Sequence, residues 1–346
     1  MPVLPECVRS ASRTDSSRGE FDVSIFKEVF QLSIFSAQRP TLNPPSLATA
    51  TYGAAGIQRP MFKVIALASS LFGFVTNLSA QFTPAFLQND SYWGDGKAEF
   101  NFYDAKIVRE AQLRPCEVLH ILVREAFDPK QWTKVDDWKR PGVIPVVKLN
   151  QILHVPTGTY AYQQMHSSFW KIDNGLLLKW SLTSNDSSGN TFKEMRRFGE
   201  QLAFNWHTYW DGMADGSENI APPANGYFYD ELPLRVRTID FSKSTGEFEI
   251  QLAPTMINSK KEAIAFKPAK ISFTSREKTI DVDLEHAGGK DHFVLDREFP
   301  FLLREWSAAD GSHLKLKRSL KIDYWNYNKT GDRERALKDP MLRHPD

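Results

Sequence analysis

Short runs of alternating hydrophobic and polar residues fill the chain from Gln81 onward, and Gly, Pro, Asn or Asp interrupts them at intervals of about ten residues. The clearest run is Leu314–Tyr324, where apolar side chains and lysines alternate and Arg318 interrupts the apolar face. Successive side chains of a strand point to opposite faces, so this period of two predicts strands. A first series is expected over Ala98–Val108, Glu117–Arg124, Val143–Val155, Thr159–Phe169, Leu176–Thr183, Thr191–Arg197 and Gln201–Tyr209. A second series is expected over Glu247–Leu252, Ala269–Ser275, Thr279–Glu285, His292–Leu295, Leu302–Trp306 and Leu314–Tyr324.

Turn residues between these runs favour hairpins. Asp173-Asn174-Gly175 and Ala287-Gly288-Gly289 suit turns that need a positive φ. The expected fold class is therefore all-β: a large antiparallel meander of curved sheets, arranged as a sandwich or a half-barrel. A short C-terminal helix is expected over Asp332–Lys338, capped by Thr330 or Asp332.

A polar stretch rich in Pro and Gly, Asp211–Gly226, separates the two strand series. Stretches of this kind form long surface loops or domain boundaries. The β-rich region 81–346 is therefore expected to divide, if it divides at all, into lobes of about 81–210 and 227–330.

Met61–Ala80 has the layout of a cleavable export signal. Lys63 precedes the apolar run Val64–Val75, and Ala80 offers a small residue at the cleavage point. The run is shorter than the roughly 20 residues that a helix needs to cross a bilayer. The alternative to a signal is that Met61–Ala80 forms a buried helix in the core. We expect a mature protein that is secreted or periplasmic.

Sixty residues precede this signal, although a signal of this type must be N-terminal. The simplest explanation is that translation starts at Met61 and that residues 1–60 are a non-native read-through or a disordered leader. The alternative is a genuine leader in which Phe21–Phe35 forms a short helix. Since no cysteine stands directly after the apolar run, a lipid anchor is not expected at this place, nor is a stable membrane span in the mature chain.

Composition excludes several classes of function. The formal net charge of +1 gives no bulk attraction to nucleic acid, so no nucleic-acid partner is expected. The chain has two cysteines, Cys7 and Cys116, which rules out a disulfide framework. Cys116 lies in the apolar run Cys116–Val123 and is expected to behave as a small buried hydrophobe.

Five short sequence strings between Tyr92 and Leu337 form a recognisable set. They are Trp93 with Gly96-Lys97-Ala98-Glu99, Val146–Asn150, Thr157–Tyr160 with Tyr162 and Met165, Phe299-Pro300 with Trp306, and Asp323–Asn326 with Asn328. In these strings the chain resembles a family of uncharacterised secreted bacterial proteins, a resemblance that implies no chemistry. Some members carry the label of septum-formation inhibitors of the Maf type, an α/β nucleotide pyrophosphatase with an N-terminal Ser-Pro-Arg-Arg-like loop. That loop is missing from this sequence, and an export signal conflicts with a cytosolic nucleotide enzyme, so this label does not carry over.

The sequence contains no motif that indicates catalysis, a cofactor or a metal. The eight histidines form no HExxH and no zinc spacing with cysteine, and no G-x-S-x-G turn or glycine-rich phosphate loop is present. We therefore assign no catalytic residue, no metal ligand and no cofactor. Carboxylates that could serve a glycosidase are plentiful, for example Asp136, Asp137, Glu194, Glu200 and Glu298, but their separations do not follow from sequence.

Aromatic residues on neighbouring predicted strands are the one candidate binding feature. Trp170, Trp180, Trp206, Tyr209 and Trp210 could form a platform for a sugar or an apolar ligand, although packing in the core is the more common role of such residues. The sequence favours a non-catalytic β-sheet protein outside the cytoplasm that binds an apolar, glycan or envelope ligand or acts as an envelope scaffold. The alternative is an extracellular polysaccharide hydrolase that uses a carboxylate pair.

Overall fold

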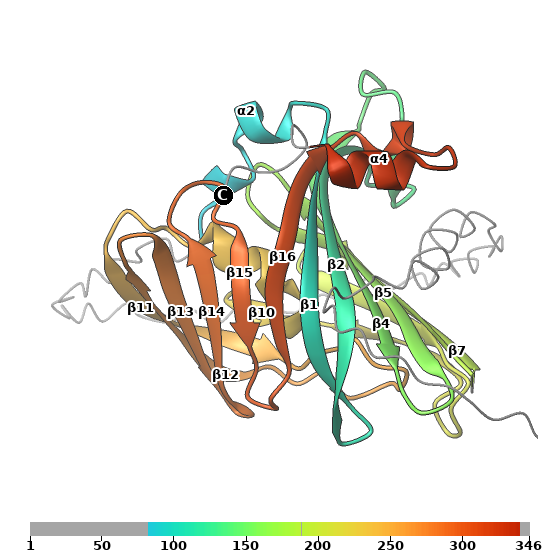
Figure 1. Cartoon of the computed structure of the whole chain (residues 1–346). Coiled ribbons are helices and arrows are strands. Elements are labelled where there is room, and N and C mark those ends of the chain that lie inside the picture. The colour runs from blue at the N-terminus through green and yellow to red at the C-terminus, as the bar shows by residue number, and fades with distance from the viewer. Residues whose placement is uncertain (1–81, 188, 340–346) are drawn as a thin grey trace, which may run out of the picture. The chain divides into compact units, whose positions relative to one another are not determined.

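The computed structural model describes residues 82–187 and 189–339. The predicted all-β class is confirmed: strands dominate, the sheet is mostly antiparallel and curved, and a short helix follows near the C-terminus (Figure 1). The expected signal Met61–Ala80 and the expected leader 1–60 lie outside the described residues, as does Cys7.

The strands follow the chain in two long meanders. The first contains β1 (Ala98–Arg109), β2 (Gln112–Asp128), β3 (Thr133–Val135), β4 (Ile144–Pro156), β5 (Ala161–Lys171), β6 (Leu177–Asp186), β7 (Gly189–Phe198), β8 (Gln201–His207) and β9 (Asp215–Ile220). The second contains β10 (Gly226–Phe228), β11 (Thr245–Ala253), β12 (Lys267–Ser275), β13 (Thr279–His286), β14 (Gly289–Asp296), β15 (Leu303–Ser307) and β16 (His313–Ile322). The helical pieces are η1 (Pro84–Phe86), α2 (Asp90–Trp93), η2 (Tyr229–Glu231), α3 (Leu232–Arg235), η3 (Val236–Thr238), η4 (Tyr324–Asn326) and α4 (Asp332–Lys338).

Every predicted strand coincides with an observed one, but the loop expected at Asp211–Gly226 contains a further strand. β9 pairs with β8 inside that stretch, from Leu202↔Ile220 to His207↔Asp215. Its alternation of exposed and half-buried residues carries few apolar side chains, which is why the hydrophobic pattern did not reveal it.

Both meanders belong to one sheet, because β16 pairs with β1. The order across the sheet is β10-β11-β12-β13-β14-β15-β16-β1-β2-β4-β5-β6-β7-β8-β9, with β3 attached to β2. The pair of β10 and β11 is parallel, and the other pairs of described strands are antiparallel.

The sheet must curl strongly, since its two edge strands are consecutive in the chain. Fifteen strands in a flat row would place the outer ones about 67 Å apart at ordinary strand spacing. The chain from Ile220 at the end of β9 to Gly226 at the start of β10 can span at most about 22 Å. The edges therefore approach each other at one end, and the inner face of the sheet becomes concave.

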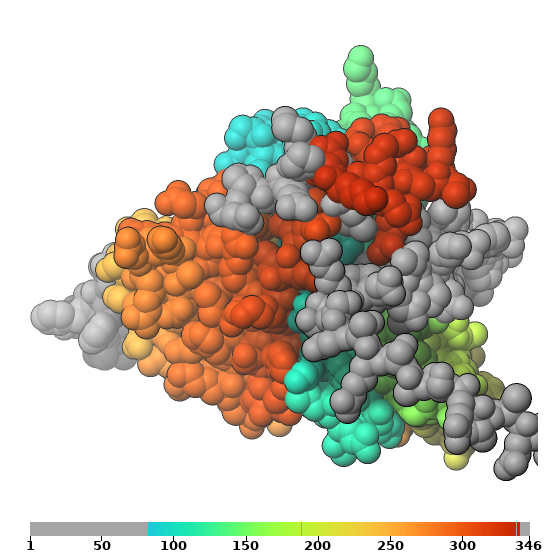
Figure 2. Space-filling view, in the orientation of Figure 1, coloured from blue at the N-terminus to red at the C-terminus, as the bar shows by residue number. Residues whose placement is uncertain are grey.

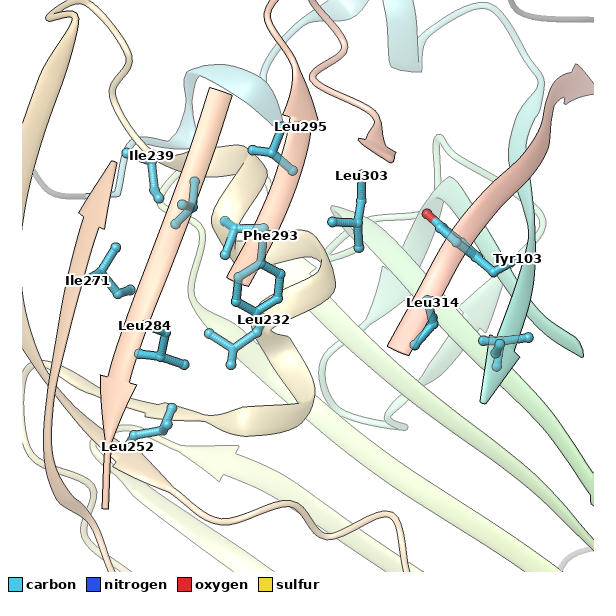
Figure 3. Close-up of a cluster of buried hydrophobic side chains, with 14 of the residues drawn as sticks. Tyr103, Leu232, Ile239, Leu252, Ile271, Leu284, Phe293, Leu295, Leu303 and Leu314 are labelled. Atoms are coloured by element: carbon cyan, nitrogen blue, oxygen red, sulfur yellow. The ribbon is translucent and has the colours of Figure 1, made fainter. Parts of the chain in front are cut away.

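The concave face is filled by a helical segment that we call the plug, residues Tyr229–Thr238, formed by η2, α3 and η3. Leu232 and Val236 are buried in a cluster that includes Ile107 from the first meander and Leu284 from the second. Figure 3 shows Leu232 beside Phe293, with Leu284 on one side and Leu303 on the other. The plug thus holds the two arms of the sheet around a common core.

The outer face carries a second apolar cluster under α4. Ala336 of α4 packs with Ala98, Phe100, Leu320 and Ile322, and Figure 2 shows the red C-terminal segment seated over this end of the sheet. The predicted helix is confirmed, but its expected cap is wrong. The N-cap is Gly331, whose φ of 86° suits glycine, while Asp332 accepts a hydrogen bond from the Lys329 amide at 3.0 Å. No helix within the described ranges is long and apolar enough to span a membrane.

A bulge in β16 changes which face its apolar residues occupy. Phe102 pairs with Arg318 but Tyr103 pairs with Leu316, so one extra residue lies in β16 at this point. Leu314 packs in the inner core, whereas Leu320 packs in the outer cluster. The single apolar face expected for Leu314–Tyr324 is therefore wrong, because a one-residue shift turns the side chains beyond it to the opposite face.

Candidate functional site

A cavity of about 570 Å³ lies at the end of the concave face where the β1–β2, β13–β14 and β15–β16 hairpins meet. Side chains of both meanders form its walls, among them Ile107, Leu153, Phe293 and Leu314. The volume lies within the range of about 300–1,000 Å³ typical of small-molecule sites, and the lining is mainly apolar, as is usual for such sites.

A loop over residues 254–266 covers one side of the cavity. Asp230 of the plug holds it by accepting hydrogen bonds from the Thr255 hydroxyl at 2.6 Å and the Met256 amide at 2.8 Å. Burial raises the pKa of Asp230 to about 6 because the charged carboxylate is poorly solvated there.

Lys193 of β7 holds the same loop from the other side. Its ammonium donates to the Met256 carbonyl at 3.2 Å, to Asn258 Oδ1 at 2.7 Å and to the Lys260 carbonyl. Burial lowers the pKa of Lys193 to about 8. The loop is therefore fixed by two buried groups rather than by regular secondary structure.

The densest cluster of polar groups in the cavity wall surrounds Asp291, whose side chain is fully buried. Its carboxylate accepts from the Tyr229 hydroxyl at 2.5 Å, the Ala309 amide at 2.8 Å and Trp306 Nε1 at 3.4 Å. His286 Nε2 lies 3.1 Å from the same carboxylate.

The His286–Asp291 pair is not arranged as a general base. The Gly288 amide donates to His286 Nδ1 at 3.1 Å, which assigns the ring proton to Nε2, facing Asp291. A histidine that acts as a base needs a free nitrogen directed at its substrate. Here both ring nitrogens already have partners, so the pair is suited to holding the β13–β14 hairpin.

Arg109, at the end of β1, brings a cation into the cavity wall. Its guanidinium donates to the Val108 carbonyl at 2.8 Å, to Gln164 Oε1 at 2.9 Å and to the Ile257 carbonyl at 3.3 Å. These acceptors are all neutral, and Arg109 forms no ion pair with any described residue. Burial lowers the pKa of Arg109 below its ordinary value.

A row of buried side chains crosses six neighbouring strands beneath the plug, and five of these strands contribute a polar residue to it. Strand register places in one line Asn101, His120, Gln151, His166 and, beyond Leu182, Lys193. Gln151 Nε2 donates to the Asp230 carbonyl at 2.8 Å, which ties this row to the plug.

The two histidines of the row are uncharged at neutral pH. Burial lowers the pKa of both His120 and His166 to about 3. His166 is held between Gln151 Nε2 at 2.9 Å and the Ser168 hydroxyl at 2.7 Å. A pKa this low makes a weak base, and these contacts suit a structural role.

The aromatic residues named from the sequence lie in two places. Trp170 and Trp180 are buried in the core, where Trp170 Nε1 donates to Glu231 at 3.0 Å and Trp180 packs on His166. Trp206, Tyr209 and Trp210 lie at the β8–β9 hairpin, and none of the five lines the cavity. Their role in binding stays a prediction.

Lysines of the 254–266 loop cover two of these rings. Lys260 lies over Trp210 at 4.6 Å and Lys261 over Trp206 at 4.8 Å from the ring centres, whereas Tyr209 is 77% exposed. The carboxylates named from sequence, at positions 136, 137, 194, 200 and 298, are also absent from the residues that line the cavity.

Comparison with known proteins adds nothing to this geometry: no protein-family model matches the chain, and neither a curated protein nor a solved structure matches it. The function is therefore inferred from the cavity and its residues.

Proposed function

We propose that this protein is a non-catalytic binding protein that holds an apolar ligand in the cavity of its curled sheet. The observation that carries the proposal is the cavity itself, which is about 570 Å³ in volume and walled by aliphatic and aromatic side chains of both meanders. Burying a ligand there removes apolar surface from water at a gain of about 25 cal/mol per Å².

The polar groups of the cavity favour binding over hydrolysis. A glycosidase needs two carboxyl groups that are free to act on substrate. Asp291 is engaged by Tyr229, and Asp230 by Thr255. Asp310 accepts from the Ser312 amide at 2.8 Å. These engagements hold the chain around the cavity, so the polysaccharide hydrolase is the weaker candidate.

The proposal places this activity outside the cytoplasm, on the strength of the signal layout at Met61–Ala80. N-terminal sequencing of exported protein tests it. A mature chain that starts at Gln81 is expected, and residues from before Met61 in exported protein would contradict the proposed start.

A cavity-filling substitution tests the binding proposal. Ala265 is exposed, lies in the loop and lines the cavity, so Ala265→Trp places an indole in the space with little effect on the sheet. Ala224→Trp, in the exposed connection between β9 and β10, is the matched control. The probe is N-phenyl-1-naphthylamine, a neutral dye whose fluorescence rises in apolar surroundings.

Wild type and Ala224→Trp are expected to bind the dye saturably and with equal affinity. Ala265→Trp is expected to weaken binding about tenfold or more, which corresponds to about 1.4 kcal/mol. Failure of the wild type to bind, or equal binding by Ala265→Trp, would refute the proposed site.

A further inference from the structure

Arg109 is a cation in a largely apolar wall and has no ion-pair partner among the described residues. A guanidinium has five N–H donors. Arg109 donates three hydrogen bonds to described residues, so two of its N–H groups have no acceptor among these residues. Arg109 is partly buried, and a cation that has lost part of its hydration is stabilised by a nearby anion.

The carboxylates around the cavity act on Arg109 only at longer range: Asp310 and Asp230 raise its pKa against the effect of burial, but neither forms an ion pair with it. Asp291, Asp230 and Asp310 each accept hydrogen bonds from their own neighbours, and none lies within 4.0 Å of the Arg109 guanidinium. Lys267 also lines the cavity, is exposed, and forms no ion pair with the described part of the chain. Two lining cations therefore have no carboxylate of a described residue within 4.0 Å.

We propose that the ligand is a single-chain amphipathic carboxylate, a fatty acid, whose head group pairs with Arg109 while its hydrocarbon chain lies against the apolar walls. Leu153 and Leu314 line the same cavity as Arg109 and give the chain its contact surface. This inference rests on the proposed function, since it specifies the chemistry of the ligand that the cavity holds.

The test compares two probes that differ only in charge: a dansyl-labelled medium-chain fatty acid and its methyl ester. Fluorescence titrations use the full chain as wild type, Arg109→Met and Arg109→Lys. Arg276→Met, which removes an exposed arginine paired with Asp281 outside the cavity, is the matched control.

Wild type and Arg276→Met are expected to bind the acid about 10- to 100-fold more tightly than the ester, the range of one charge-assisted hydrogen-bonded contact. Arg109→Met is expected to bind the ester as wild type does and to lose the preference for the acid. Arg109→Lys, which keeps the charge, is expected to retain part of that preference.

Two results would overturn the inference: equal affinity of the wild type for acid and ester, or a preference for the acid that survives in Arg109→Met. Either result leaves the proposed function standing. If neither probe binds the wild type, the proposed function fails and the inference falls with it. Should Arg109→Met not fold, the wild-type comparison and Arg109→Lys still decide the question.

Discussion

Arg237 of the plug and Glu99 of β1 lie 138 positions apart and form a buried two-point ion pair, with Nη1 donating to Oε1 at 2.7 Å and Nη2 to Oε2 at 2.9 Å. Tyr92 and Asn101 donate to the same carboxylate at 2.5 and 2.6 Å, and Arg237 also donates to the Pro300 carbonyl. The pair joins the plug to the centre of the sheet.

Breaking this ion pair is expected to destabilise the protein strongly. Glu99→Gln leaves the buried guanidinium of Arg237 without its counter-charge, which costs about 3–5 kcal/mol. Glu305→Gln, which breaks the exposed pair with Lys315, should cost no more than about 1 kcal/mol. Urea unfolding measures both, and a similar small loss in the two variants would contradict the role given to Glu99.

The buried histidines predict a loss of stability in acid. His166 has a folded pKa of about 3, below its unfolded value, so the unfolded chain binds the extra proton between these two values. For this residue, the free energy of unfolding should be nearly constant above about pH 7.5 and should fall by about 1.4 kcal/mol per pH unit below about pH 5.5.

Comparison of His166→Asn with the control His207→Asn isolates this contribution. His207 is exposed, with 63% of its side chain accessible. The slope of stability against pH should flatten in His166→Asn alone, and an unchanged slope would show that His166 titrates normally in the folded protein.

Asp230 predicts the opposite dependence of stability on pH. Its folded pKa of about 6 lies above that of an unfolded Asp, so the folded protein keeps the proton that the unfolded chain loses. The stabilisation is complete below about pH 4 and is lost as the pH rises through 6, a change of about 3 kcal/mol.

Asp230→Asn removes this titration. The unfolding free energy of the variant minus that of wild type should increase by about 3 kcal/mol as the pH rises from 4 to 7.5. This change is expected whatever the variant's stability at either pH. The exposed Asp240→Asn provides the control. A difference between variant and wild type that does not vary with pH would contradict the raised pKa.

Cys116 is expected to react slowly with thiol reagents. Burial raises the pKa of its thiol to about 11, and the thiolate is the reactive form. In a Cys7→Ser background, where Cys116 is the remaining cysteine of the sequence, modification by a chromogenic disulfide at pH 8 should be about 100-fold slower in the folded than in the urea-unfolded protein. Equal rates would show an accessible, ordinary thiol.

The strands could be predicted from the sequence because each carries its own hydrophobic period. The predicted Ala98–Val108 ends one residue before β1 does, and Val143–Val155 differs from β4 by one residue at each end. The bulge in β16 leaves no such signal along the chain, since one inserted residue moves Leu320 and Leu314 to opposite faces and only the pairing with β1 reveals it.

The plug and the cavity could not be predicted in this way. Asp230, Glu231, Arg235 and Arg237 give the plug a charged sequence typical of an exposed turn, yet all four are buried. Their partners come from distant parts of the chain, such as Glu99 and Trp170. In the sequence Arg109 is likewise an ordinary polar residue at the end of a strand, and its place in the cavity wall depends on both meanders closing around it.

Methyl NMR of the full chain during titration with dodecanoate shows where a ligand binds. Saturable shifts are expected at the cavity methyls of Ile107, Leu153 and Leu314, and none at Ile121 and Ile322 in the outer cluster. An absence of saturable shifts at the cavity methyls, or shifts confined to the outer cluster, would contradict a ligand site inside the curled sheet.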